Sequence, residues 1–339
     1  MCPRGEVLYR RLPQKQSEQM ENGLPTFDYR DLSNPDSPLL QALQTTCHLT
    51  GFFYLRHPAL VSGSLARIFR QAREFFILPF EEKNAIHISR SPHYRGYSIL
   101  DEEETRGTPD HKETLDLGME ASPLPAGPDY HILQGPNQWP GSLPEFREAT
   151  TAYLSEVRAV GEQLMRTLAA SLSLPEETFA RHFDPPYCML RLIAYPPVSG
   201  DVPQQQGIGE HTDFGCLTIL AQDDVGGLEV RNADGSWITA QPKPDCLIVN
   251  LGDMLETWTA RYFMATPHRV RSPRGDATRF SIPFFLEPSL DTEVEPLPSD
   301  LLPRFKRETF RDLPSRPILY GRHMLQAFRR SYPGIANNA

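Results

Sequence analysis

The sequence predicts a mainly β protein with flanking helices, in which a sandwich or jelly roll of short strands follows a helical N-terminal portion. Between residues 186 and 290, short apolar and β-branched runs alternate with Gly, Pro, Asp and Asn, and no helical pattern separates them. Residues 146–172 carry apolar side chains three to four apart, which is typical of one long helix. No internal repeat or second core pattern occurs, so we expect a single domain.

We expect a polar N-terminal tail at residues 1–23 and one domain at residues 24–339. In chain order, this domain would comprise a helical and β support region at 24–185, the strand-rich core at 186–290, and a C-terminal helical segment at 291–339.

Apolar periodicity and turn residues define the elements of the support region. In order, they are a strand at 26–29, a helix near 38–49, a strand at 52–55 and an amphipathic helix at 61–78. Pro79 stops that helix. Six prolines between residues 118 and 145 then predict an irregular surface crossing. The long helix that follows should pack against the sheet.

In the core we expect strands at 189–194, 216–221, 227–230, 237–240, 246–250, 268–271 and 280–286. We interpret Asn250, Gly252 and Asp253 as a turn that positions a strand, without a catalytic role. A helix at 320–331 should close the chain.

Composition excludes several classes of partner. The 339 residues carry a formal net charge of -9 and no block of Lys or Arg, which argues against nucleic acid. No run of eighteen apolar residues and no N-terminal apolar leader occurs, so we expect no membrane association. Five cysteines without a CxxC pair indicate reduced thiols and a cytoplasmic protein.

One stretch carries the chemistry. His211 and Asp213 are two residues apart, so on an extended strand both side chains project to the same face. His268, on a distant strand, is the candidate third ligand. Two imidazoles and one carboxylate on one side of a metal suit non-haem Fe(II). Further along, Arg279 and Ser281 are also two apart, and a guanidinium beside a hydroxyl is suited to hold a carboxylate.

These motifs resemble those of the isopenicillin N synthase-like branch of the 2-oxoglutarate and Fe(II)-dependent oxygenases. The matching runs are HTDFGCLTILAQDDVGGLEV, NLGDMLETWT, TPHRV and RFSIPFF, and weaker matches extend upstream over nearly all of the chain. The resemblance implies a double-stranded β-helix core, of the jelly-roll or cupin-like kind. It also implies Fe(II), 2-oxoglutarate and O2 as cofactor and co-substrates, with release of succinate and CO2 as a small-molecule substrate is hydroxylated or desaturated.

The resemblance also implies roles for individual residues. The metal ligands would be His211, Asp213 and His268. The distal carboxylate of 2-oxoglutarate would contact Arg279, Ser281 and Tyr195. We expect no catalytic residue beyond the metal ligands.

The substrate side of the pocket is less defined by the sequence. Arg191 lies an even offset from Tyr195 on one strand, so the two side chains share a face. Arg191 could read a substrate carboxylate, as an equivalent arginine does in the ethylene-forming enzyme, which this chain also resembles. Its alternative role is pairing with a buried acid. Phe214, Leu228 and Phe285 either line the pocket or pack in the core.

Three functions remain open at this point. The first is a 2-oxoglutarate-dependent dioxygenase, acting as a monomer or weak dimer. The second is an oxidase like isopenicillin N synthase, which takes all four electrons from its substrate without 2-oxoglutarate. The third is a non-enzymatic jelly-roll binding module. The C-terminal residues 333–339 lack the Gln-containing end of the synthase, and the ligands and clamp are intact, so we favour the first.

Overall fold

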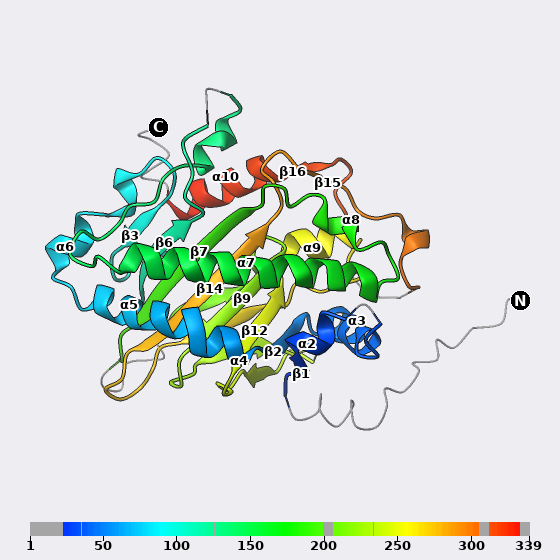
Figure 1. Cartoon of the computed structure of the whole chain (residues 1–339), viewed down its shortest axis with the longest axis horizontal. Helices are drawn as coiled ribbons and strands as arrows, with labels where there is room; N and C mark the ends of the chain where they lie inside the picture. Colours follow the sequence, from blue (N-terminus) through cyan, green and yellow to red (C-terminus); the bar gives the residue numbers. More distant parts are fainter. Residues whose placement is uncertain are drawn as a thin grey trace, which may run out of the picture.

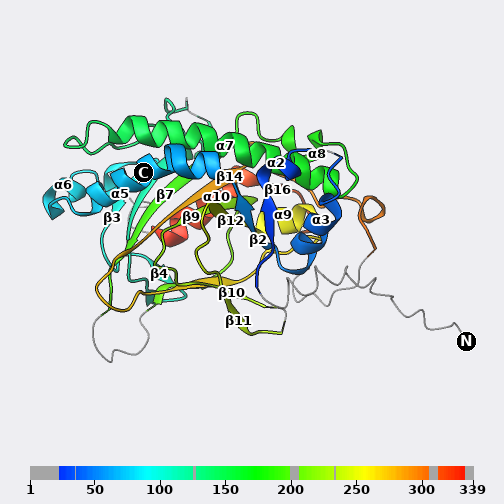
Figure 2. The ribbon, with the colours of Figure 1, turned by 60° about the horizontal axis from the view of Figure 1, so that its bottom comes forward.

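The computed structural model describes residues 23–34, 36–124, 127–198, 206–232, 234–304 and 312–332. Helices, an eight-stranded sheet and a four-stranded sheet form successive layers, as Figures 1 and 2 show. The predicted tail lies, except for Gly23, outside the described residues, and so does the C-terminal segment 333–339.

The large sheet joins strands from both ends of the chain in the order β1-β2-β12-β9-β14-β7-β6-β3. Its strands are β1 (Thr26–Asp28), β2 (Phe52–Arg56), β3 (Gly96–Ser98), β6 (Glu113–Gly118), β7 (Tyr187–Tyr195), β9 (Leu217–Gln222), β12 (Cys246–Leu251) and β14 (Arg279–Glu287). Neighbours pair antiparallel except for β1 and β2, which are parallel. Strands of the support region and of the core therefore share one sheet.

The small sheet lies on the opposite side of the large sheet from helices α5 and α7 (Figure 2). Its order is β11 (Trp237–Thr239), β10 (Leu228–Arg231), β13 (His268–Arg271) and β8 (Gln206–His211). Two short antiparallel pairs complete the described strands: β4 (Glu104–Thr105) with β5 (Thr108–Pro109), and β15 (Glu293–Val294) with β16 (Ile318–Leu319).

The helices cover the outer face of the large sheet and its ends. In chain order they are α2 (Tyr29–Leu32), α3 (Leu40–Leu49), α4 (Pro58–Leu60), the π-helix η1 (Val61–Leu65), α5 (Ala66–Phe76), α6 (Phe80–Asn84), η2 (Ile88–Arg90), η3 (Asp129–Leu133), α7 (Phe146–Ser171), α8 (Glu177–Ala180), α9 (Asp253–Trp258), η4 (Ser299–Leu301) and α10 (Tyr320–Ser331). The predicted long helix and C-terminal helix are confirmed as α7 and α10.

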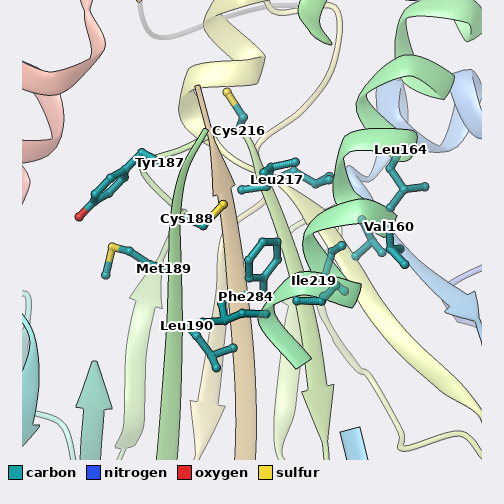
Figure 3. Packing of buried hydrophobic residues seen from close by; sticks show 14 of the residues in the cluster. Val160, Leu164, Tyr187, Cys188, Met189, Leu190, Cys216, Leu217, Ile219 and Phe284 are labelled. Atoms are coloured by element: carbon teal, nitrogen blue, oxygen red, sulfur yellow. The ribbon is translucent and has the colours of Figure 1, made fainter. Parts of the chain in front are cut away.

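The main core lies between α7 and the large sheet. Figure 3 shows Val160 and Leu164 of α7 beside Leu217 and Ile219 of β9. Successive side chains of a β-strand point to opposite faces of the sheet, so β14 contributes residues to both faces of the large sheet. Its even-numbered residues, such as Phe284, belong to this core, whereas Arg279, Ser281, Pro283, Phe285 and Glu287 line a cavity on the other face.

The predicted jelly-roll class with supporting helices is confirmed, but three local predictions are corrected. The helix expected at 61–78 is continuous only over α5, because Gly63 has non-helical angles (φ -94°, ψ -114°) and the preceding turn is a π-helix. The strands β3 and β6 were not expected. Asn250, Gly252 and Asp253 do not form a turn that positions a strand: Asn250 lies within β12, and Gly252 precedes Asp253, the first residue of α9, whose amides hold the loop described below. Within the described residues, no helix has both the length and the apolar run needed to cross a membrane.

Candidate active site

Two imidazoles meet where β8 and β13 pair. His211 and His268 are direct partners across these antiparallel strands, and their ring centroids lie 4.3 Å apart. The Nδ1 atom of His211 lies 2.8 Å from the carbonyl oxygen of Gly209, and that of His268 lies 3.0 Å from the carbonyl oxygen of Thr266. Because a carbonyl only accepts, each Nδ1 must donate, which leaves each Nε2 with a free lone pair.

Asp213 completes the cluster from a loop. β8 ends at His211, so the expectation that both residues lie on one extended strand is wrong, although their side chains do converge. The Oδ1 atom of Asp213 is 3.7 Å from Nε2 of His211 and 3.6 Å from Nε2 of His268. The three ligand atoms lie within 4.8 Å of one another. This spacing fits a facial set of two imidazoles and one carboxylate around one metal ion.

Neighbouring groups hold the carboxylate of Asp213 in this orientation. Its Oδ2 atom accepts hydrogen bonds from Thr218 Oγ1 (2.5 Å) and Asn250 Nδ2 (2.6 Å), which leaves Oδ1 to face the imidazoles. Metal ligands are commonly oriented by such outer hydrogen bonds. The sequence analysis interpreted Asn250 as a turn residue and gave it no catalytic role. The available signal was a buried asparagine inside the apolar strand β12, a position that needs a polar partner.

The loop itself is held by α9 and by Glu287. The amide of Asp253 donates to the carbonyl of Asp213 (2.8 Å), and the amide of Met254 donates to that of Gly215 (3.0 Å). The carboxyl of Glu287 accepts from the amide of Cys216 at 2.7 Å. A side chain at position 215 would collide with this carboxyl, so the close approach requires glycine.

The protonation states suit a metal. Burial, and then the second imidazole, lower the pKa of His211 to about 3, so this ring stays neutral. Burial alone would raise the pKa of Asp213, but His268, His211 and the two hydrogen-bond donors lower it further than burial raises it. Neutral imidazoles and an ionised carboxylate are the forms that bind a divalent cation.

Arg279 lies deep in the same cavity. Its side chain is fully buried, its Nη1 donates to Ser281 Oγ and its Nη2 to Gln222 Oε1, each at 3.3 Å. Its guanidinium also lies 4.8 Å from the ring centroid of Tyr195. Among the described residues no carboxylate lies within ion-pair distance of Arg279, and its Nε has no partner. A buried guanidinium without a protein carboxylate beside it is suited to bind the carboxylate of a ligand.

The metal cluster and Arg279 open into one cavity of about 540 Å³. Phe214, Leu228 and Phe285 all line it, as the sequence allowed. Phe214 is 43% exposed at the mouth, whereas Leu228 is buried and also packs with Tyr195 in a second apolar cluster. Phe285 is half-buried, on the cavity face of β14.

Arg191 lines the cavity and shares a face of β7 with Tyr195, as predicted, but its donors are engaged. Its Nε and Nη2 donate to the two oxygens of Asp116 (2.6 and 2.7 Å), and its Nη1 donates to Glu103 (2.9 Å). Arg191 therefore pairs with buried acids, which was the alternative role that the sequence analysis gave it. The geometry gives no support for a free fork that reads a substrate carboxylate.

A buried ionic cluster surrounds this arginine. Lys112 Nζ lies 2.9 Å from Asp110 and 3.2 Å from Glu103. Within the described chain, the three carboxylates of Glu103, Asp110 and Asp116 thus face two cations, Lys112 and Arg191. The sequence prediction missed this cluster because its members come from separate strands and loops.

Two family descriptions match the chain. They are the 2OG-Fe(II) oxygenase superfamily over residues 186–288 and the non-haem dioxygenase in morphine synthesis N-terminal region over residues 24–142.

Individual relatives match over most of their length. A homoarginine-6-hydroxylase of Oryza sativa subsp. japonica is 35% identical, over 86% of this chain and 89% of that protein. A 2-oxoglutarate-dependent ethylene/succinate-forming enzyme of Ralstonia nicotianae is 31% identical, over 86% of each. Among solved structures, a full-length Neurospora crassa protein in complex with alpha-KG and thymine has a TM-score of 0.78 and 28% identity, covering 92% of this chain and 98% of that one.

Proposed function

This chain belongs to the 2OG-Fe(II) oxygenase superfamily, and from that premise we propose which of its side chains serve the reaction. The chain is an oxidoreductase, an Fe(II) and 2-oxoglutarate-dependent dioxygenase that acts on a small molecule. When bound, Fe(II) and 2-oxoglutarate together activate O2, and substrate oxidation is accompanied by formation of succinate and CO2.

We assign the metal to His211, Asp213 and His268. The observation that carries this assignment is the convergence of two free Nε2 atoms and one free Oδ1, while the remaining atom of each ligand is hydrogen-bonded elsewhere. The residues fit Fe(II), because mixed imidazole and carboxylate donors on one side leave the other side for co-substrates.

We assign the distal carboxylate of 2-oxoglutarate to Arg279 and Ser281. The incoming carboxylate would neutralise the charge of the buried guanidinium. It would accept hydrogen bonds from the unpartnered Nε–H side of Arg279 and from the hydroxyl of Ser281. Tyr195 would contribute through its ring, which flanks the guanidinium and keeps water from it.

The test is an anaerobic titration. Protein with Fe(II) should develop a weak visible charge-transfer band as 2-oxoglutarate is added. In His268→Ala the band should be lost, and in Arg279→Ala its midpoint should move to a much higher 2-oxoglutarate concentration. A band unaffected by both substitutions would refute the assignment.

We further propose hydroxylation of a small substrate that carries a cationic group. Relatives 31–36% identical to this chain are named homoarginine-6-hydroxylases, and the cluster of Glu103, Asp110 and Asp116 exceeds its two cations by one negative charge. L-homoarginine is therefore the first compound to test. A product heavier by one oxygen atom, formed with an equal amount of succinate, is the expected result.

An oxidase like isopenicillin N synthase would form no succinate when its substrate is oxidised, so succinate release in the same assay separates the two activities. We also propose a cytoplasmic enzyme that is a monomer or weak dimer. Its net charge of -9 and its five cysteines without a CxxC pair support this. Sedimentation of the purified protein would test the oligomeric state.

A further inference from the structure

The C-terminal helix α10 forms one wall of the cavity. Met324, Ala327, Phe328 and Tyr332 from this helix and its end line the space into which the metal cluster opens. Tyr332, the last residue that the structure describes, is only 6% exposed. The size of the substrate side of the cavity therefore depends on where the last turns of α10 lie.

The two ends of α10 are held differently. At its start, the amides of Tyr320 and Gly321 donate to the carbonyls of Thr292 and Leu290, at 2.9 and 2.8 Å. In the first turn, the Nε2 atom of His323 lies 3.2 Å from the carbonyl of Phe214, the residue after the metal ligand Asp213. These contacts fix the first turn beside the metal loop.

The last turn is held by side chains. The ring of Phe328 lies 4.9 Å from that of Tyr94 and 6.4 Å from that of Tyr332. Arg329 makes an ion pair with Asp129 at 3.3 Å, but both side chains are about half exposed, so this pair contributes little.

The hydroxyl of Tyr332 reaches the buried ionic cluster. It accepts from Nη2 of Arg191 (2.9 Å), and its single proton is shared between Glu103 Oε1 (3.0 Å) and Asp116 Oδ2 (3.1 Å). Hydrogen bonds to buried ionised groups are stronger than those between neutral groups. Each charged member of the cluster has a partner within the protein, so the cluster is a fixed anchor for Tyr332 before any ligand binds.

We propose that Tyr332 is a positioning residue for the substrate: its hydroxyl holds the last turn of α10 against Arg191, Glu103 and Asp116 and thereby sets the substrate side of the cavity. The inference rests on the proposed function. Within the described chain, the hydroxyl of Tyr332 bonds to these three residues and to none of the metal ligands. The hydroxyl should therefore affect substrate binding and leave 2-oxoglutarate binding unchanged.

The test variant is Tyr332→Phe, which removes one oxygen atom and keeps the ring. Tyr130→Phe is the matched control, because Tyr130 is also buried, packs against Gly321 at the start of α10, and donates to Asp291 at 2.5 Å outside the cavity. Both variants should fold, as judged by a cooperative thermal transition.

The first measurement is hydrogen exchange in the metal-free protein, which needs no substrate. Amides of residues 324–331 should exchange about tenfold faster in Tyr332→Phe, the effect of losing a hydrogen bond to charged partners, and within about twofold of wild type in Tyr130→Phe. Equal exchange in Tyr332→Phe and wild type, or equal acceleration in both variants, would overturn the proposal.

The second measurement uses L-homoarginine as the probe. The KM for L-homoarginine should rise about tenfold in Tyr332→Phe, whereas the 2-oxoglutarate midpoint of the visible band should stay within about twofold. A parallel loss of both affinities would show a general structural defect and refute a positioning role. If wild type does not oxidise L-homoarginine, the proposed substrate fails, and the exchange measurement still decides the role of Tyr332.

Discussion

Removing the amide of Asn250 should weaken iron binding although Asn250 is not one of the three ligands. In Asn250→Ala, Oδ2 of Asp213 loses its 2.6 Å bond and keeps only the bond from Thr218. A hydrogen bond to a charged group contributes about 1.5–3 kcal/mol, and loss of an outer partner typically costs about 10–100-fold in metal affinity. Because one donor remains, we expect a loss near the lower limit, about tenfold or about 1.4 kcal/mol.

The assay is an anaerobic Fe(II) titration with saturating 2-oxoglutarate, followed by the charge-transfer band. Asn137→Ala is the control, since Asn137 is similarly buried and bonds to the backbone of Gly118 without lining the cavity. The control should bind Fe(II) like wild type. The double variant of Asn250→Ala with Thr218→Val should lose about 100-fold, as both donors to Oδ2 are then gone. Wild-type iron affinity in the double variant would show that Asp213 does not depend on these bonds.

Three further predictions concern ionisable groups around the cavity. Arg279→Lys keeps the charge but loses the fork, so 2-oxoglutarate binding should weaken about tenfold or more while the Fe(II) midpoint stays the same; an equal shift of both would contradict the assignment. Arg191→Met leaves Asp116 buried without a cation and Glu103 paired with Lys112 alone, and we expect a loss of about 3–5 kcal/mol in the free energy of unfolding; full stability with a raised substrate KM would instead favour a substrate-reading arginine. Burial raises the pKa of Glu287 from 4.5 to about 8, so the folded state binds its proton more tightly than the unfolded state. The stability that this proton provides is complete below pH 4.5 and is lost as the pH rises toward 8; Glu287→Gln should flatten the fall in melting temperature over that interval, and an unchanged slope would exclude Glu287 as its source.

The residue types of the candidate metal site and the long helix α7 were predictable from the sequence. The convergence of His211, Asp213 and His268 could be expected from their residue types, although the strand expected to carry both His211 and Asp213 ends at His211. α7 was predictable because its apolar spacing persists for many turns.

Contacts that depend on pairing between distant strands could not be predicted from the sequence. Arg191 meets Asp116 because β6 and β7 pair in the register that places these two residues opposite each other, 75 positions apart in the chain. The kink at Gly63 was missed for another reason: the apolar pattern continues through it, and periodicity does not report a single non-helical residue.

The position of the metal cluster has a consequence for the whole domain. Its two histidines belong to the four-stranded sheet, whereas its aspartate lies on the loop that leads into β9 of the eight-stranded sheet. A bound ion is therefore a cross-link between the two layers of the sandwich, which in the described chain share no strand pairing. Loss of iron should weaken the contact between the two sheets at the active site, where the apolar cluster that includes Tyr195 and Leu228 then remains to hold them together.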